Sequence, residues 1–90
     1  MRYDARTDAD QDDIVQAARC WGASVCLLHR VGGGVPDILI GYKGVNLLVE
    51  VKTLSGELNE RQREWHEDWR GQVCVVRSVS QLEKLLLSLA

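Results

Sequence analysis

Two acidic residues and one lysine are the residues of this 90-residue chain whose types and spacing could do chemistry. Asp37 follows a proline, and Glu50 and Lys52 come about a dozen residues later with Val51 between them. Two neighbouring carboxylates repel each other, and the pKa of one rises unless a cation joins them. Mg²⁺ suits such a pair, because it binds one or two carboxylates together with phosphate oxygens and waters. An ammonium group can hold a water or offset charge on a phosphate. The three residues could therefore hydrolyse a phosphate ester.

A predicted β-hairpin brings these side chains together. Two apolar runs with β-branched residues flank Lys43 and Gly44, a turn-like dipeptide. A two-residue turn at this point places Asp37 opposite Glu50, with Cβ atoms about 5 Å apart. Side chains alternate between the two faces of a strand, so Lys52 emerges on the same face as Glu50. The same register predicts the pairs Tyr42–Val45 and Leu39–Leu48.

A cross-strand ion pair on a solvated surface is the alternative interpretation of these three charges. The neighbours argue against it, because both faces of the predicted hairpin are apolar. They are Ile38, Leu39, Ile40, Leu47, Leu48, Val49 and Val51. Strands of this kind are usually buried on both sides, and a buried charge needs a partner. The pattern therefore favours a functional cluster.

The same residues resemble a known nuclease signature. Pro36-Asp37 followed by Glu50-Val51-Lys52 is similar to the motif of the PD-(D/E)XK nuclease superfamily. The surrounding segments, residues 33–37 and 49–53, resemble the VRR-NUC family within it. Small stand-alone members of that family occur in phages and prophages, and others are appended to larger repair nucleases. The resemblance extends from about Asp10 to Arg77.

The resemblance implies a function and a site. Asp37, Glu50 and the backbone carbonyl of Val51 would bind Mg²⁺ or Mn²⁺, and Lys52 would position or activate the attacking water. The implied activity is metal-dependent hydrolysis of phosphodiester bonds in DNA. A homodimer with two active sites is expected, and such a symmetric particle suits branched DNA such as a four-way (Holliday) junction.

The predicted elements form an α/β fold in a single domain, residues 1–90. The expected architecture is a restriction-endonuclease-like αβββαβ(α) core, with a four-stranded mixed sheet flanked by helices on both faces. Besides the hairpin, we expect a helix over 8–21 with Thr7 as N-cap, followed by a strand over 24–29. After the hairpin we expect a helix from its cap Asn59 to residue 70, a strand over 73–77, and a last helix capped by Ser80. The crossover helix implies that Val51 and Val73 belong to parallel neighbours.

Composition narrows the class of protein. The net charge is −2, which argues against tight, salt-tolerant binding of nucleic acid. The three cysteines form no C-x-x-C pair and are predicted to be small core residues in a reducing compartment. No apolar run approaches the length of a membrane span. We expect a cytoplasmic protein, in the host cell cytoplasm if a phage encodes it.

Several residues are candidates for support of the site or contact with nucleic acid. Gln62 could complete a capping box with Asn59, lie near the active site, or do both. Gln11 is the favoured position on the first helix for a side chain facing the site. Gly33 and Gly34 could allow a nucleic-acid backbone to approach closely, or could form a loose connection.

Other polar and aromatic residues have weaker support. Arg30 and Arg63 are candidate phosphate contacts, although helix arginines often pair with neighbouring acids. His66 is predicted to lie on the surface. Trp65 and Trp69 are four residues apart on one helix, which favours core or dimer packing over base stacking.

Two other functions stay open at the level of sequence. One is a catalytically inactive module that binds nucleic acid or assembles with a partner. The other is hydrolysis of RNA or of a small nucleotide. The complete set of Asp37, Glu50 and Lys52 argues against loss of activity.

Overall fold

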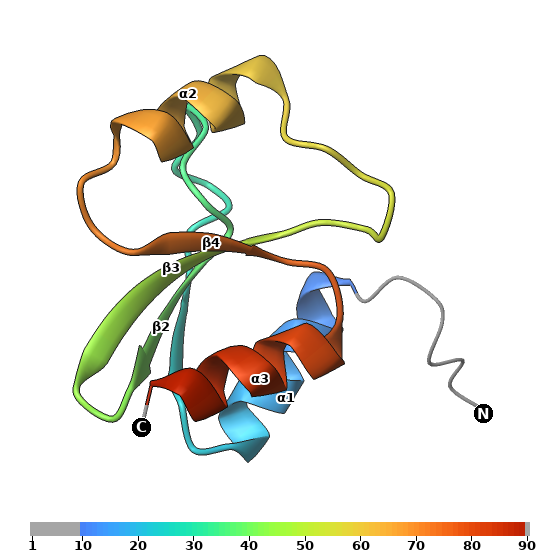
Figure 1. Ribbon diagram of the computed structural model, residues 1–90, viewed down its shortest axis with the longest axis vertical. Coiled ribbons are helices and arrows are strands. Elements are labelled where there is room, and N and C mark those ends of the chain that lie inside the picture. Colours follow the sequence, from blue (N-terminus) through green and yellow to red (C-terminus); the bar gives the residue numbers. More distant parts are fainter. Residues whose placement is uncertain (1–9, 90) are drawn as a thin grey trace.

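The computed structural model describes residues 10–89, and it contains three helices and four strands within that range. In chain order these are α1 (Gln11–Cys20), β1 (Ser24–Leu27), β2 (Ile38–Tyr42), β3 (Val45–Val51), α2 (Glu60–Asp68), β4 (Val73–Val76) and α3 (Val79–Ser88). This is the element order that the sequence predicts. Figure 1 shows the elements along the chain.

The strands form one mixed sheet in the order β1-β2-β3-β4. β1 pairs with β2, and β2 with β3, in antiparallel fashion, whereas β3 and β4 are parallel. The hairpin register is the predicted one, since Tyr42 pairs with Val45 and Leu39 with Leu48. The turn works because Lys43 and Gly44 both adopt positive φ angles, 52° and 78°, as a two-residue hairpin turn of type I′ requires.

The starts of two helices differ from the predicted ones. Asp10 caps α1, because its side chain accepts a hydrogen bond from the Asp13 amide, so the helix begins at Gln11 and not at residue 8. Thr7, the predicted cap, lies outside the described residues. Ser78 rather than Ser80 caps α3, through a bond from the Gln81 amide. Both differences have one cause: Thr7 precedes Asp10 by three residues and Ser80 follows Ser78 by two, and Thr, Ser and Asp can all serve as caps.

The core lies between the sheet and the pair α1 and α3. Ile14 and Ala18 from α1, and Leu82 and Leu86 from α3, are fully buried. They pack against the strand side chains that point to the same face, Ile38, Ile40, Leu47 and Val49. The apolar stripe predicted for the first helix therefore packs in this core. No helix within the described range is long and apolar enough to cross a membrane.

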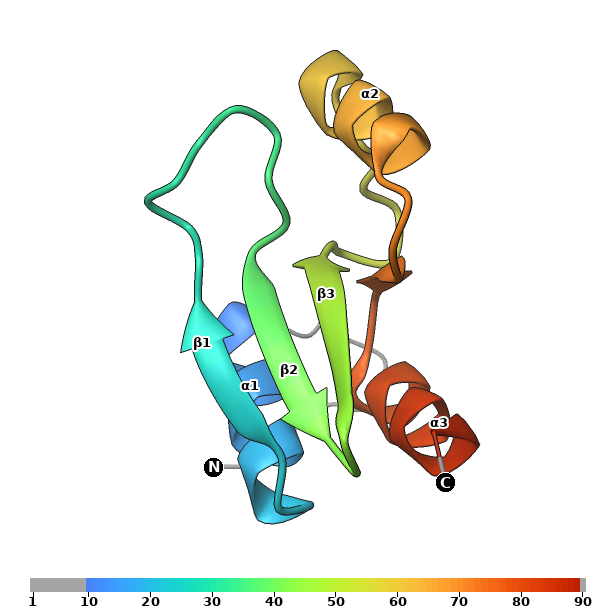
Figure 2. The same ribbon diagram turned by 90° about the vertical axis from the view of Figure 1, so that its left-hand side faces the viewer.

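The second helix is placed differently from the other two. α2 lies on the opposite side of the sheet from α1 and α3 (Figure 1), beyond the end at which β3 finishes (Figure 2). It has no buried residue of its own. In Figure 2 the strands face the viewer with no helix in front of them, so this face of the sheet is open next to α2.

Candidate active site

The backbones of Asp37 and Lys52 are fixed at one end of the sheet. Each residue lies just outside its strand, but the hydrogen-bond ladder continues to include it. The Leu28 amide donates to the Asp37 carbonyl at 2.8 Å, and the Lys52 amide donates to the Val76 carbonyl at 3.1 Å. Neighbouring strands on both sides therefore hold the two ends of the hairpin in place.

The side chains of Asp37, Glu50 and Lys52 emerge on the same open face of the sheet. The register ends with the pair Ile38–Val49, so Asp37 and Glu50 occupy the next position of the hairpin, and alternation brings Lys52 to the side of Glu50. Asp37 Oδ2 accepts a hydrogen bond of 2.8 Å from the Val51 amide. Lys52 Nζ lies 3.9 Å from Glu50 Oε2. The structure thus brings together the three residues that the sequence singles out.

Glu50 is a buried carboxyl group whose surroundings disfavour its charged form. The residue is 2% exposed. Burial and the nearby charge of Asp37 raise its pKa from 4.5 to about 8, although Lys52 acts in the opposite direction. One oxygen, Oε2, accepts a 3.1 Å hydrogen bond from Gln62 Nε2. The other, Oε1, is buried and has no hydrogen-bond partner among the described residues.

The residues present fit a hard divalent cation. A buried carboxylate oxygen without a partner is costly, and a cation at this point would satisfy Glu50 Oε1 and offset its repulsion from Asp37. Within residues 10–89 no group of three or more His, Cys, Asp or Glu side chains could form a closed metal cage. Two carboxylates and a backbone carbonyl instead suit Mg²⁺, which keeps waters and binds phosphate oxygens.

Gln62 performs both roles that the sequence allows. Its Oε1 accepts a 3.0 Å hydrogen bond from the Asn59 amide, while Asn59 Oδ1 accepts from the Gln62 amide at 2.9 Å. This capping box starts α2. The amide nitrogen of the same side chain is left to donate to Glu50. The helix cap therefore aims a donor at the buried carboxyl group.

Gly34 holds the glycine-rich loop against the start of α2. Its φ angle is +89°, and a Cβ atom would lie 2.6 Å from the Arg61 carbonyl oxygen. Gly33 also has a positive φ, but a Cβ there would meet no atom within 4 Å. Gly34 is thus a packing residue that supports the position of Gln62, whereas Gly33 lies in open space.

The remaining predicted residues do not join the cluster. Gln11 is the first residue of α1 and makes no side-chain hydrogen bond with any described residue. Arg30 is exposed in the loop between β1 and β2. Arg63 donates to the Leu58 carbonyl at 3.2 Å, which is a local contact that steadies the entry to α2.

His66 is a residue of this site that the sequence interpretation missed. The expectation that it lies on the surface holds only in part: the residue is partly exposed, but its Nε2 atom is buried and has no partner among the described residues. Burial and the charge of Lys52 lower its pKa. The available signal was its spacing: His66 follows Gln62 by four residues, and such residues share a helix face.

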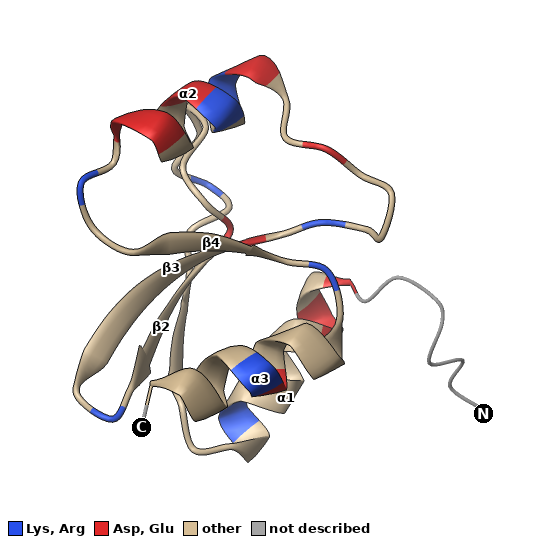
Figure 3. Ribbon diagram, in the orientation of Figure 1, with Lys and Arg blue, Asp and Glu red and all other residues tan. Residues whose placement is uncertain are grey.

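Charge is distributed unevenly around the site. Figure 3 shows acidic residues along α2 with basic residues between them, and Lys and Arg form no continuous stripe over the fold. Arg77 is one of these, and its guanidinium donates to the carbonyls of Thr53 and Gly56. It thereby secures the loop that follows Lys52.

A four-stranded mixed sheet with an Asp–Glu–Lys cluster at one strand end defines a nuclease-like α/β domain. A solved structure described as a VRR_NUC domain matches this chain with a TM-score of 0.70 and 30% sequence identity. The match covers 86% of this chain and 94% of the other. The chain therefore belongs to the VRR-NUC family of nuclease domains. A scan of protein-family models and a search of curated proteins gave no match.

Proposed function

We propose that this protein is a divalent-metal-dependent endonuclease that acts on DNA, with Asp37, Glu50 and Lys52 as its catalytic residues. The observation that carries the proposal is the buried Glu50, which has one unpartnered oxygen and a lysine 3.9 Å from the other. This arrangement is costly in a metal-free protein and becomes favourable once a cation is bound. Membership of the VRR-NUC family supports the same conclusion.

The proposed roles follow from the contacts. Asp37, Glu50 and the Val51 carbonyl would hold Mg²⁺ or Mn²⁺, and the ion would polarise the phosphoryl oxygen of the scissile bond. Lys52 is 20% exposed and can reach a substrate. Its ammonium group orients a water for in-line attack and offsets the charge that develops on the phosphate. Gln62 fixes the orientation of Glu50 by donating to Oε2.

Branched DNA is the proposed substrate and a homodimer the proposed form. One 10.1 kDa chain offers a single set of the three catalytic residues. Paired cuts across a four-way junction need two such sets, which a two-fold symmetric dimer provides. Its resemblance to small stand-alone members of the family supports this choice.

The test is a cleavage assay on linear, flap, splayed and four-way DNAs with Mg²⁺ and with Mn²⁺. The wild-type protein should cut, with four-way DNA preferred, and should sediment at twice the mass of one chain. Lys52→Ala should abolish cleavage and leave the fold and DNA binding largely intact. Full activity of Lys52→Ala would refute the mechanism. Binding without cutting under any metal would indicate an inactive binding module instead.

A further inference from the structure

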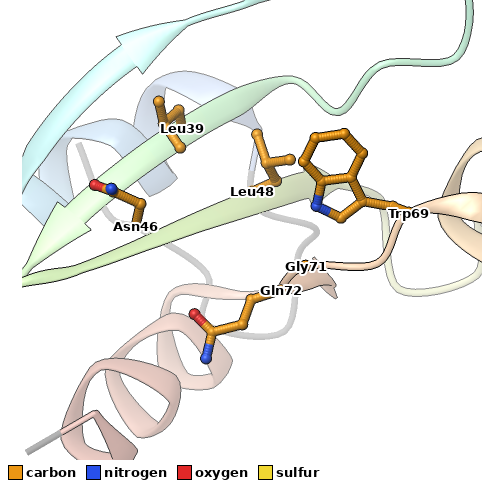
Figure 4. Close-up of a pocket in the computed structure, with 6 residues that line it drawn as sticks. All are labelled: Leu39, Asn46, Leu48, Trp69, Gly71 and Gln72. Atoms are coloured by element: carbon orange, nitrogen blue, oxygen red, sulfur yellow. The ribbon is translucent and has the colours of Figure 1, made fainter.

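An apolar hollow lies on the open face of the sheet, outside the catalytic cluster. It measures about 370 Å³ and is lined by Leu39, Asn46, Leu48, Trp69, Gly71 and Gln72. Figure 4 shows the indole of Trp69 beside Leu48 at one end of the hollow and Asn46 towards the other end. The volume falls within the range of about 300–1,000 Å³ that is typical of small-molecule sites.

The hollow adjoins the candidate active site. Leu39 and Leu48 face each other across the hairpin. Leu39 is two residues from Asp37, and Leu48 is two residues from Glu50, so all four side chains project from the same face. A group bound in the hollow would therefore lie on the same face as the carboxylates, two residue positions further along the strands.

The lining selects a neutral, planar ligand with polar edges. None of the six lining residues is charged, so a phosphate would find no cationic partner there. Leu39 and Leu48 provide an apolar floor, Trp69 an aromatic surface, and Asn46 and Gln72 amide groups that can donate and accept. A nucleobase has this combination of an apolar face and hydrogen-bonding edges.

Trp69 is held in place for such a contact. The residue ends α2, and its amide donates to the Trp65 carbonyl. One side of the indole stacks on Trp65, with centroids 4.6 Å apart and planes at 16°. A Cβ atom at Gly71 would lie 2.8 Å from Trp69 Nε1, so the missing side chain allows the indole its position. The residue is nevertheless 46% exposed.

We propose that the hollow binds an unpaired nucleobase of the DNA strand, next to the phosphodiester at the catalytic residues. This inference rests on the proposed nuclease function and deepens it. A base within a duplex is stacked and cannot enter, so the hollow would favour DNA whose strands separate near the cut. A second copy of the chain is the competing occupant. The spacing of Trp65 and Trp69 in the sequence favours such packing between copies. The lining, however, places the amide groups of Asn46 and Gln72 in the same hollow as the indole, and these match the hydrogen-bonding edges of a base, which favours the base.

Binding measurements test the proposal without relying on cleavage. We would use Lys52→Ala as the background, in Ca²⁺, with splayed-arm DNA and the same DNA carrying abasic residues in its arms. The base-bearing arms should bind about tenfold more tightly, which is the effect expected of one stacked base. Adding Trp69→Ala should remove this preference, while Trp69→Phe should keep most of it. Equal binding of both DNAs would overturn the proposal.

A second variant guards against an effect on folding. Asn46 is exposed on β3, and Phe is favoured in strands, so Asn46→Phe should fold and fill the hollow. It should abolish the preference for bases without weakening the binding of blunt duplex. An unchanged preference in both Trp69→Ala and Asn46→Phe would overturn the proposal. So would conversion of a dimer to a monomer by either variant, which would assign the hollow to a second copy.

An NMR measurement locates the contact directly. The chain has three tryptophans, and Trp69→Phe assigns the indole N–H signal that disappears. That signal should shift on addition of base-bearing arms and stay in place with abasic arms. A base-dependent shift without cutting under any metal would contradict the nuclease proposal but not the base-binding proposal. Cutting without any base-dependent shift would contradict the base-binding proposal but not the nuclease proposal.

Discussion

At the scale of the residue, the buried carboxyl group of Glu50 costs folding stability in the metal-free protein, and it is also the group proposed to bind the cation. Its folded-state pKa is raised to about 8 from 4.5 by burial and by Asp37. The metal-free folded protein therefore holds a proton that the unfolded chain releases at lower pH. Stability from this group is complete below pH 4.5 and is lost as the pH rises to about 8.

We predict that the free energy of unfolding in EDTA falls between pH 5 and pH 8, by at most about 1.4 kcal/mol per pH unit. Glu50→Gln keeps the shape of the side chain and should flatten this decline. The lowered pKa of His66 acts in the opposite sense, since it adds stability as the pH rises towards 6.5. The difference between wild type and Glu50→Gln, measured by urea unfolding, isolates Glu50. Parallel pH profiles for the two proteins would contradict the prediction.

At the scale of the element, the position of α2 depends on a few contacts at its first turn. The helix buries no residue of its own, and Gly34 packs against the Arg61 carbonyl immediately before Gln62. The glycine-rich loop and the capping box together therefore determine whether Gln62 reaches Glu50.

Gly34→Ala should displace α2 and lower the cleavage rate by roughly tenfold, which is the effect of losing one hydrogen bond to a charged group. Gly33→Ala is the matched control, because it introduces a similar positive-φ strain with no atom within 4 Å. Gln62→Ala should lower the rate as much as Gly34→Ala, and the two changes together should cost little more than either alone. Equal rates for Gly33→Ala and Gly34→Ala would contradict this account.

The contrast between the hairpin and α2 shows what the sequence could predict. The two-residue turn at Lys43 and Gly44 determines the register, so the pairing around Asp37 and Glu50 followed from local chemistry. The partial burial of His66 did not, because Trp65 is the one apolar residue of α2 and the inward face of the helix is decided by contacts with the sheet. The hollow likewise forms only when Trp69, distant in sequence, lies beside Leu48. Such contacts depend on tertiary packing and leave no periodic signal.

At the scale of the whole molecule, the charge of the chain gives the proposed cation a role in binding DNA as well as in catalysis. The net charge is −2, and the basic residues form no continuous stripe in Figure 3. The carboxylates of Asp37 and Glu50 face the side where a phosphate must approach. A divalent ion there changes the local sign of the potential.

We therefore predict that Ca²⁺ tightens binding of four-way DNA by at least about tenfold over EDTA at matched ionic strength, which corresponds to about 1.4 kcal/mol. The double variant Asp37→Asn with Glu50→Gln removes both carboxylates, and Asn can still accept from the Val51 amide. Its affinity should no longer depend on Ca²⁺ and should equal or exceed that of wild type in EDTA. Fluorescence anisotropy measures each case. A response to Ca²⁺ that survives in the double variant would place the cation elsewhere on the protein, because no carboxylate would remain at this end of the hairpin to bind it.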